Sequence, residues 1–262
     1  ILLCSGGKHS KIRMTGVAAA SMKGEKVPMF VIGKSQKPRC FKNLKQLPCR
    51  YRGQKKSWMD STLFEEWVRE LDEKMEKDNR RIALIIDNCT AHPEIGGLKA
   101  IDIFFLPPNT TSVLQPMDQG VIRSLKAKYR VKVIQKMIEA IDKKKELPQI
   151  SLLDAMKMLV LAWDEVTEKT VQNCFKKAGF TEIDENTLSS DDPFRALNDT
   201  IRQLSILDEN FKDLSAKDVA SFDDAVSVTQ GLISDEEILS DILGNEVEEI
   251  QDEEDNGQDG AS

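Results

Sequence analysis

The chain has 262 residues, of which 40 % are apolar and 31 % charged, and its formal net charge is -7. This length allows one sizeable core with appendages, and no stretch approaches the ~20 apolar residues of a membrane-spanning helix. Its five cysteines are scattered without a Cys-x-x-Cys pair, which argues against a zinc module and a disulfide framework. We therefore expect a reducing compartment, cytosol or nucleus, and no membrane partner.

The net charge hides a division along the chain. Residues 1–147 contain 29 Lys and Arg against 16 Asp and Glu, whereas residues 148–262 contain 8 against 28. A basic region suits a polyanion such as DNA, because phosphates attract Lys and Arg whatever the base sequence. A merely soluble surface explains the same charge equally well.

The first predicted elements are a β-hairpin and a helix. Residues 12–20 and 27–32 are β-prone runs on either side of the turn SMKGEK. Residues 33–57 are basic and interrupted by prolines, which predicts a loop without regular structure. In the following segment apolar residues recur at helical spacing, and Thr62 with Glu65 forms a capping-box pattern.

Two apolar runs come next. Residues 82–86 (IALII) show no polar alternation, which is typical of a strand covered on both faces, and residues 101–106 (IDIFFL) form a second run. Two strands joined by a short crossover, after a hairpin and a helix, predict an α/β domain with a mixed sheet flanked by helices.

The rest of the chain is predicted to be helical and then disordered. Helical patterns cover residues 118 to about 145 and 152–166, the latter capped by Ser151 with Asp154, and a shorter pattern ends at Gly179. From about residue 182 the acidic, polar composition predicts disorder with transient helices at most. We thus divide the chain into an α/β domain (1–146), a helical extension (147–181) and an acidic tail (182–262).

Two acids stand at positions that suit a metal site. Asp87 directly follows the first apolar run, and Asp118 lies just after Pro116, at the start of the next helix. A strand-tip acid and a helix-start acid can converge on one divalent cation, such as Mg²⁺ or Mn²⁺. A helix-capping role explains a lone strand-tip acid as well, so the residues alone leave the choice open.

Neighbouring side chains could support such a site. His92 could orient a phosphate or a water molecule, and Asn88 could hydrogen-bond Asp87, although each could equally be a cap or a packing residue. Basic residues on the helix after Asp118 are predicted to contact DNA phosphates. They are Arg123, Lys126, Lys128, Arg130 and Lys132. A basic loop has a looser predicted link to DNA, through Lys34, Lys37, Arg39, Lys42 and Lys45.

Several stretches resemble one family. They are CSGGKHSKIRMTGVAAAS, FVIGKSQKPRCFKN, SWMDSTLFEEWVRELD, LIIDNCTAHP and FFLPPNTTSVLQPMDQGVIRSLKAKYR. Over about residues 4–180 the chain resembles the transposase domain of the pogo/Tigger transposable element-derived proteins, relatives of centromere protein B and jerky. The resemblance implies an RNase H-like fold, DNA as partner, a nuclear location and no small-molecule substrate. It also implies three catalytic acids that hold two Mg²⁺ ions, with Asp87 as the second acid and Asp118 as the third.

The chain departs from that family at its beginning. The family's first acid lies in an Asp-Glu-Thr-Gly stretch upstream of CSGGK, whereas nothing before Glu25 is acidic here. Because the chain starts with Ile1, we expect a fragment that lacks the first strand and, by itself, catalysis. Three functions stay open: a transposase-derived DNA-binding protein with an incomplete endonuclease site, an active Mg²⁺-dependent transposase if an upstream segment supplies the acid, and a non-catalytic protein-interaction scaffold. A homo-oligomer also stays open.

Overall fold

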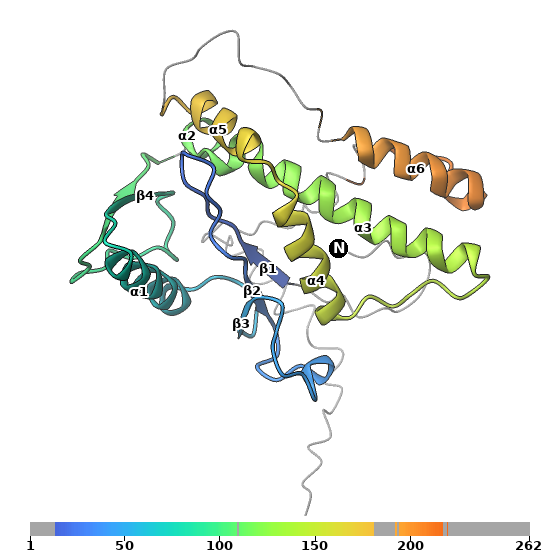
Figure 1. Cartoon of the computed structure of the whole chain (residues 1–262), viewed down its shortest axis with the longest axis horizontal. Helices are drawn as coiled ribbons and strands as arrows, with labels where there is room; N and C mark the ends of the chain where they lie inside the picture. Colours follow the sequence, from blue (N-terminus) through green and yellow to red (C-terminus); the bar gives the residue numbers. More distant parts are fainter. Residues whose placement is uncertain (1–13, 109, 181–191, 193, 217–218, 220–262) are drawn as a thin grey trace, which may run out of the picture. The chain divides into compact units, whose positions relative to one another are not determined.

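The computed structural model describes residues 14–108, 110–180, 192, 194–216 and 219 (Figure 1). All of them belong to Ile1–Val228, the first of two compact units into which the chain divides. Residues 220–262, which make up about half of the predicted acidic tail, lie outside the described part.

The predicted hairpin is confirmed. Strand β1 (Met14–Val17) pairs antiparallel with β2 (Phe30–Gly33), so that Thr15 lies opposite Ile32. The predicted loop after the hairpin is wrong in part, because β3 (Arg50–Gly53) pairs parallel with β2, and a short 3₁₀ helix, η1 (Arg39–Phe41), precedes it. The sequence pattern for β3 is weak, because strand prediction relies on buried apolar residues and only Tyr51 of the four residues RYRG is buried. These strands form a three-stranded mixed sheet in the order β1-β2-β3.

The predicted helix is α1 (Ser61–Lys77), but its cap differs from the prediction. The side chain of Asp60 accepts a hydrogen bond of 2.9 Å from the backbone N–H of Leu63. Asp60 is therefore the N-cap in place of Thr62, and the helix begins two residues earlier than the capping-box pattern suggests. The buried face of α1 packs in one apolar cluster with Phe30 and Ile32 of β2 and with Ile86.

Strands β4 (Ile82–Ile86) and β5 (Ile101–Phe105) form a second, parallel sheet. The prediction that the first of them is covered on both faces is wrong, since only Ile86 of β4 is buried. Alternate residues pack toward α1, whereas Ala83 is exposed and Phe104 is 55 % exposed on the other face. The α/β class is confirmed, but the described strands form two small sheets instead of one.

Helices make up the remainder of the described fold. The capping box of Ser151 with Asp154 is confirmed, and Gly179, with φ of +84°, follows the last of the predicted helices. Lys26, beside the β-hairpin turn, donates hydrogen bonds of 2.7 and 2.8 Å to the carbonyls of Trp163 and Val166. The elements are α2 (Thr111–Leu114), η2 (Met117–Val121), α3 (Ile122–Asp142), α4 (Leu152–Asp164), α5 (Glu168–Lys177), α6 (Arg195–Leu207) and η4 (Glu209–Phe211).

Helix α6 differs from the predicted disorder over its own residues, Arg195–Leu207. It lies beside α3 in Figure 1, and its buried residues Leu197, Ile201 and Leu204 join the apolar cluster of α3 and α4. These three residues follow helical spacing, so apolar burial against α3 stabilises this helix within a tail whose average composition is acidic. No helix in the described ranges is both long enough and apolar enough to cross a membrane.

Candidate metal and nucleic-acid site

Asp87 is the first residue after β4, where the parallel pair of strands ends. The backbone N–H of Leu106 donates a hydrogen bond of 2.8 Å to the carbonyl of Ile86, which fixes the strand end directly before the acid. Asp87 is 8 % exposed. The carboxyl ends of parallel strands are where α/β sheets commonly bind ligands, so this placement suits a site residue.

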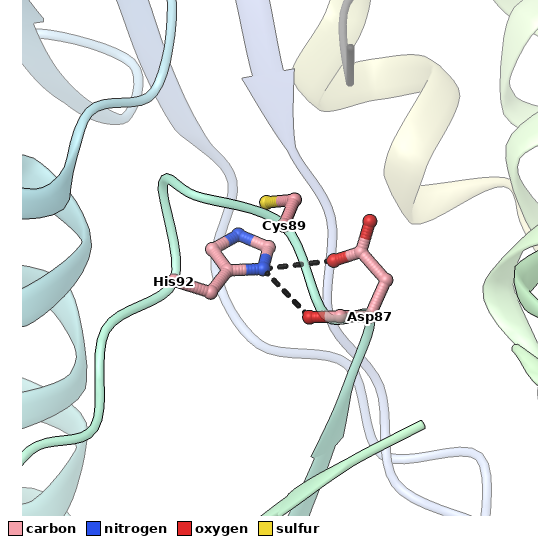
Figure 2. Close-up of side chains that lie close together, drawn as sticks. All are labelled: Asp87, Cys89 and His92. Carbon is pink, nitrogen blue, oxygen red and sulfur yellow. Dashed lines mark hydrogen bonds and ion pairs between the residues drawn. The ribbon is translucent and has the colours of Figure 1, made fainter. Parts of the chain in front are cut away.

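His92 lies against Asp87 (Figure 2). Its Nδ1 atom is 2.8 Å from Oδ1 of Asp87 and 3.2 Å from the backbone carbonyl oxygen of the same residue. The imidazole ring also packs on Phe64 of α1, with the ring centroids 4.3 Å apart and the ring planes tilted by 36°. The two oxygen atoms of Asp87 and the ring of Phe64 therefore hold the imidazole in place, and the imidazole in turn orients the carboxylate of Asp87.

Cys89, which was not among the predicted site residues, completes this group. The backbone N–H of His92 donates a hydrogen bond of 3.0 Å to the carbonyl of Cys89, which closes a turn. One ligand atom from each of Asp87, Cys89 and His92 lies within 4.8 Å of the others. Burial and the nearby charge of Asp87 raise the pKa of the Cys89 thiol. The spacing Asp-x-Cys-x-x-His after a predicted strand was the available signal.

Asp118 lies in the first turn of η2 and is influenced by Asp87 across 30 residues of sequence. Its partial burial, and next the charge of Asp87, raise the pKa of the Asp118 carboxyl, whereas Lys126 acts in the opposite direction. The two predicted acids are thus within electrostatic reach of each other, and a cation between them would relieve their repulsion.

The backbone around Asp118 is irregular. Gly120 has φ of +154° inside η2, a turn of π-helix that leads into α3. A Cβ atom at this position would lie 3.1 Å from Sγ of Cys174 on α5. Single π turns are common at functional sites, and this one contains Asp118 and directly precedes α3.

The remaining predicted site residues differ in exposure. Asn88 and Arg123 are exposed, and Lys126 and Lys128 are partly exposed. Arg130 is 1 % exposed, so the prediction that it faces DNA is wrong for this structure; it lies on the same face of α3 as the buried Ile134 and Met137. Lys132 forms an ion pair of 2.5 Å with Glu165. In the basic loop all five predicted cations are exposed: Lys34, Lys37, Arg39, Lys42 and Lys45.

Comparison with known proteins gives this arrangement a family context. The Tigger transposable element-derived protein 4 of Mus musculus is 37 % identical over 89 % of this chain and 46 % of its own length. ARS-binding protein 1 of Schizosaccharomyces pombe is 29 % identical over 81 % of the chain and 42 % of its own length. Major centromere autoantigen B of Homo sapiens is 29 % identical over 68 % of the chain and 30 % of its own length.

The chain spans about half of the length of these relatives, or less. No solved structure matches it significantly. The family model described as DDE superfamily endonuclease matches residues 12–175, which include both β-sheets, Asp87, Asp118 and the basic residues of α3. The chain therefore belongs to the DDE superfamily endonuclease family.

Proposed function

We propose that the chain is part of a transposase-derived, nuclear DNA-binding protein in which Asp87 and Asp118 are two of the acids of a divalent-metal endonuclease site. The observation that carries the proposal is the electrostatic interaction between these two carboxyls, which come from the end of β4 and the start of η2. Relatives named for centromeres, for ARS binding and for transposable elements support DNA as the partner and the nucleus as the location.

The donor set fits a hard cation. Carboxylate oxygens are the ligands that Mg²⁺ and Mn²⁺ prefer, and Asp87 is held in position by His92. When bound, such ions polarise a phosphoryl oxygen and activate the attacking nucleophile. No third acid is assigned to the site among the described residues, so we propose binding without cleavage for these residues, and cleavage only where a further acid joins them.

An RNase H-like arrangement would supply the place for that acid. Among the described strands, β1 pairs only with β2, and β4 pairs only with β5. Helix α1 nevertheless packs on residues of both sheets in one apolar cluster. A strand inserted between β1 and β4 would join the two sheets into one and would end beside Asp87.

The proposed DNA contacts are on α3 and in the basic loop. Lys126 acts electrostatically on Asp118, so a cation of α3 lies near the acids. Together with Arg123 and Lys128 it can bind phosphates next to the metal site, and the exposed loop cations can extend this surface.

A salt titration tests the DNA interface. We would compare Lys126→Gln/Lys128→Gln with Lys74→Gln/Lys77→Gln, which removes two exposed charges from α1. The first pair should weaken binding to duplex DNA and lower the slope of log affinity against log salt by about two, roughly one per phosphate contact, and the control should not. DNA affinity without salt dependence, or equal behaviour of the two variants, would remove α3 from the interface and favour a protein-interaction scaffold.

A metal titration tests the acids separately. Mn²⁺ affinity should fall in Asp87→Asn/Asp118→Asn and stay unchanged in Glu73→Gln/Asp142→Asn, which removes two exposed acids from α1 and α3. Equal Mn²⁺ affinity in the two double variants would remove Asp87 and Asp118 from the site. Cleavage of DNA with Mg²⁺ by these residues would instead indicate an active endonuclease.

A further inference from the structure

The turn after β4 brings together three different metal-ligating groups. Figure 2 shows the carboxylate of Asp87, the thiol of Cys89 and the imidazole of His92 on one side of this turn. Carboxylate, thiolate and imidazole are the three ligand types of protein zinc sites. In the site proposed for Mg²⁺ or Mn²⁺, His92 only positions Asp87 and Cys89 has no role, because a hard cation does not prefer sulfur or imidazole ligands.

The local geometry holds these groups ready for a shared ion. Nδ1 of His92 lies 2.8 Å from Oδ1 of Asp87. The three ligand atoms lie within 4.8 Å of one another. Zinc bonds of ~2.0 to 2.3 Å therefore require only small side-chain rotations.

The surroundings also suit a sulfur ligand. Cys89 is partly buried in a turn that is closed by the hydrogen bond from the backbone N–H of His92 to the carbonyl of Cys89. A metal-coordinated thiol is deprotonated outright. The packing of His92 on Phe64 limits the orientations of the ring, which reduces the entropy lost when a metal binds.

We propose that Asp87, Cys89 and His92 form a binding site for a thiophilic divalent transition-metal ion, namely Zn²⁺. Binding forms bonds from Zn²⁺ to the carboxylate oxygen, to the sulfur and to Nδ1. The thiol releases its proton to solvent, and the proton of Nδ1 moves to Nε2, so that the imidazole stays neutral. Three protein ligands leave a fourth position for water.

This inference goes beyond the proposed function, although the two share Asp87. A Zn²⁺ ion in this turn would occupy the carboxylate that the hard-metal site needs, so the two ions would exclude each other. Cys89 and His92 then decide which ion is preferred, because only Zn²⁺ gains from sulfur and nitrogen ligands. Asp118 belongs to the hard-metal site alone, and this difference separates the two proposals experimentally.

Co²⁺ is the probe, because a thiolate bound to this ion gives a charge-transfer absorption band. The reduced chain of residues 1–262 would be titrated with Co²⁺ and then with Zn²⁺. We expect a thiolate band that saturates at one ion per chain and disappears when Zn²⁺ displaces Co²⁺. Excess Mg²⁺ should leave the band in place.

Four variants test which residues bind the Co²⁺ ion. Cys89→Ser should lose the band, His92→Gln should lower Co²⁺ affinity by at least about tenfold, and the control Cys40→Ser, at a partly buried cysteine of η1, should behave as the wild type. Asp118→Asn should keep the Co²⁺ band even though it lowers Mn²⁺ affinity. Circular dichroism would establish that each variant is folded.

Two results would overturn the proposal. The first is a wild-type chain without a thiolate band, which would make the three residues a structural hydrogen-bonded group. The second is an unchanged band in folded Cys89→Ser, which would assign the thiolate to another cysteine. Loss of DNA binding or of Mn²⁺ binding would leave the Co²⁺ result untouched, so failure of the proposed function is distinguishable from failure of the zinc site.

Discussion

The buried carboxylate of Asp72, on α1, accepts a hydrogen bond of 2.8 Å from the backbone N–H of Ala100. The backbone N–H groups of Lys99 and Ile101 also donate to this carboxylate. One acid thereby satisfies three backbone donors where the chain enters β5. Since the backbone N–H of Ile82 in β4 donates to the carbonyl of Ala100, this connection also positions β4, the strand that Asp87 directly follows.

Asp72→Ala should lower the free energy of unfolding by about 1 to 3 kcal/mol or more, because it leaves up to three backbone donors without their acceptor. Urea unfolding followed by circular dichroism measures this change. Glu73→Gln, at an exposed position next to it on α1, is the control and should have almost no effect. Equal stability of the two variants would show that water replaces the carboxylate without cost.

The same carboxylate should make stability depend on pH. Burial alone would raise the pKa of Asp72, but the N–H donors of Ala100, Lys99 and Ile101 outweigh burial and hold the pKa below its usual range. A carboxyl with a lowered pKa in the folded state stabilises the fold above the unfolded pKa of about 3.9, and this contribution disappears as pH falls through the folded pKa. The stability advantage of the wild type over Asp72→Asn should therefore be constant near neutral pH and shrink below about pH 4. A pH-independent difference would contradict this assignment.

Asp118→Asn should have the opposite effect on stability. The pKa of Asp118 is raised in the folded protein, by burial first and by Asp87 second, so its charged form destabilises the fold at neutral pH. The substitution should increase the melting temperature at pH 7 without divalent ions, and the gain should vanish below the unfolded pKa of about 3.9. Asp142→Asn, at an exposed position of α3, is the control. A lower melting temperature for Asp118→Asn would show that the carboxylate is structural.

Gly120→Ala should disturb both the fold and the hard-metal site. Its φ of +154° is strained for any residue with a side chain, and the new Cβ would meet Sγ of Cys174 at 3.1 Å. We expect a loss of about 1 to 3 kcal/mol in the free energy of unfolding and a weaker Mn²⁺ affinity, because Asp118 lies two residues away. Gly96→Ala, where a Cβ meets nothing within 4 Å, should change neither quantity. Unchanged Mn²⁺ binding in Gly120→Ala would separate the π turn from the position of the acid.

Periodic and capping signals were enough to predict several elements. The apolar spacing that predicts α1, the Ser151 and Asp154 capping box, and the glycine that follows α5 are local features, and local features are visible in sequence. The position of Asp87 at a strand end followed in the same way. The residues alone allowed Asp87 and Asp118 to converge on one cation but left the choice open, and the family resemblance favoured it, since no local pattern connects residues that are 31 positions apart.

The errors concern tertiary environment. Five apolar residues in β4 predict burial, but the number of faces that a sheet covers depends on which elements pack on it. Arg130 was assigned to the surface because of its charge, although its spacing from Ile134 and Met137 places it on the buried face of α3. Helix α6 was missed because acidic neighbours outweighed three apolar residues in the composition. In each case the burial of the residues depends on packing against elements that are distant in sequence.

The open face of the second sheet has a practical consequence. Phe104 and Ala83 are exposed on the face away from α1, and β4 pairs only with β5 among the described strands. An apolar face beside an available strand edge is a template for the addition of strands from other molecules. Concentrated samples of these residues are therefore expected to aggregate. Phe104 is the first residue to replace, for example by Thr, when crystals or solution spectra are sought.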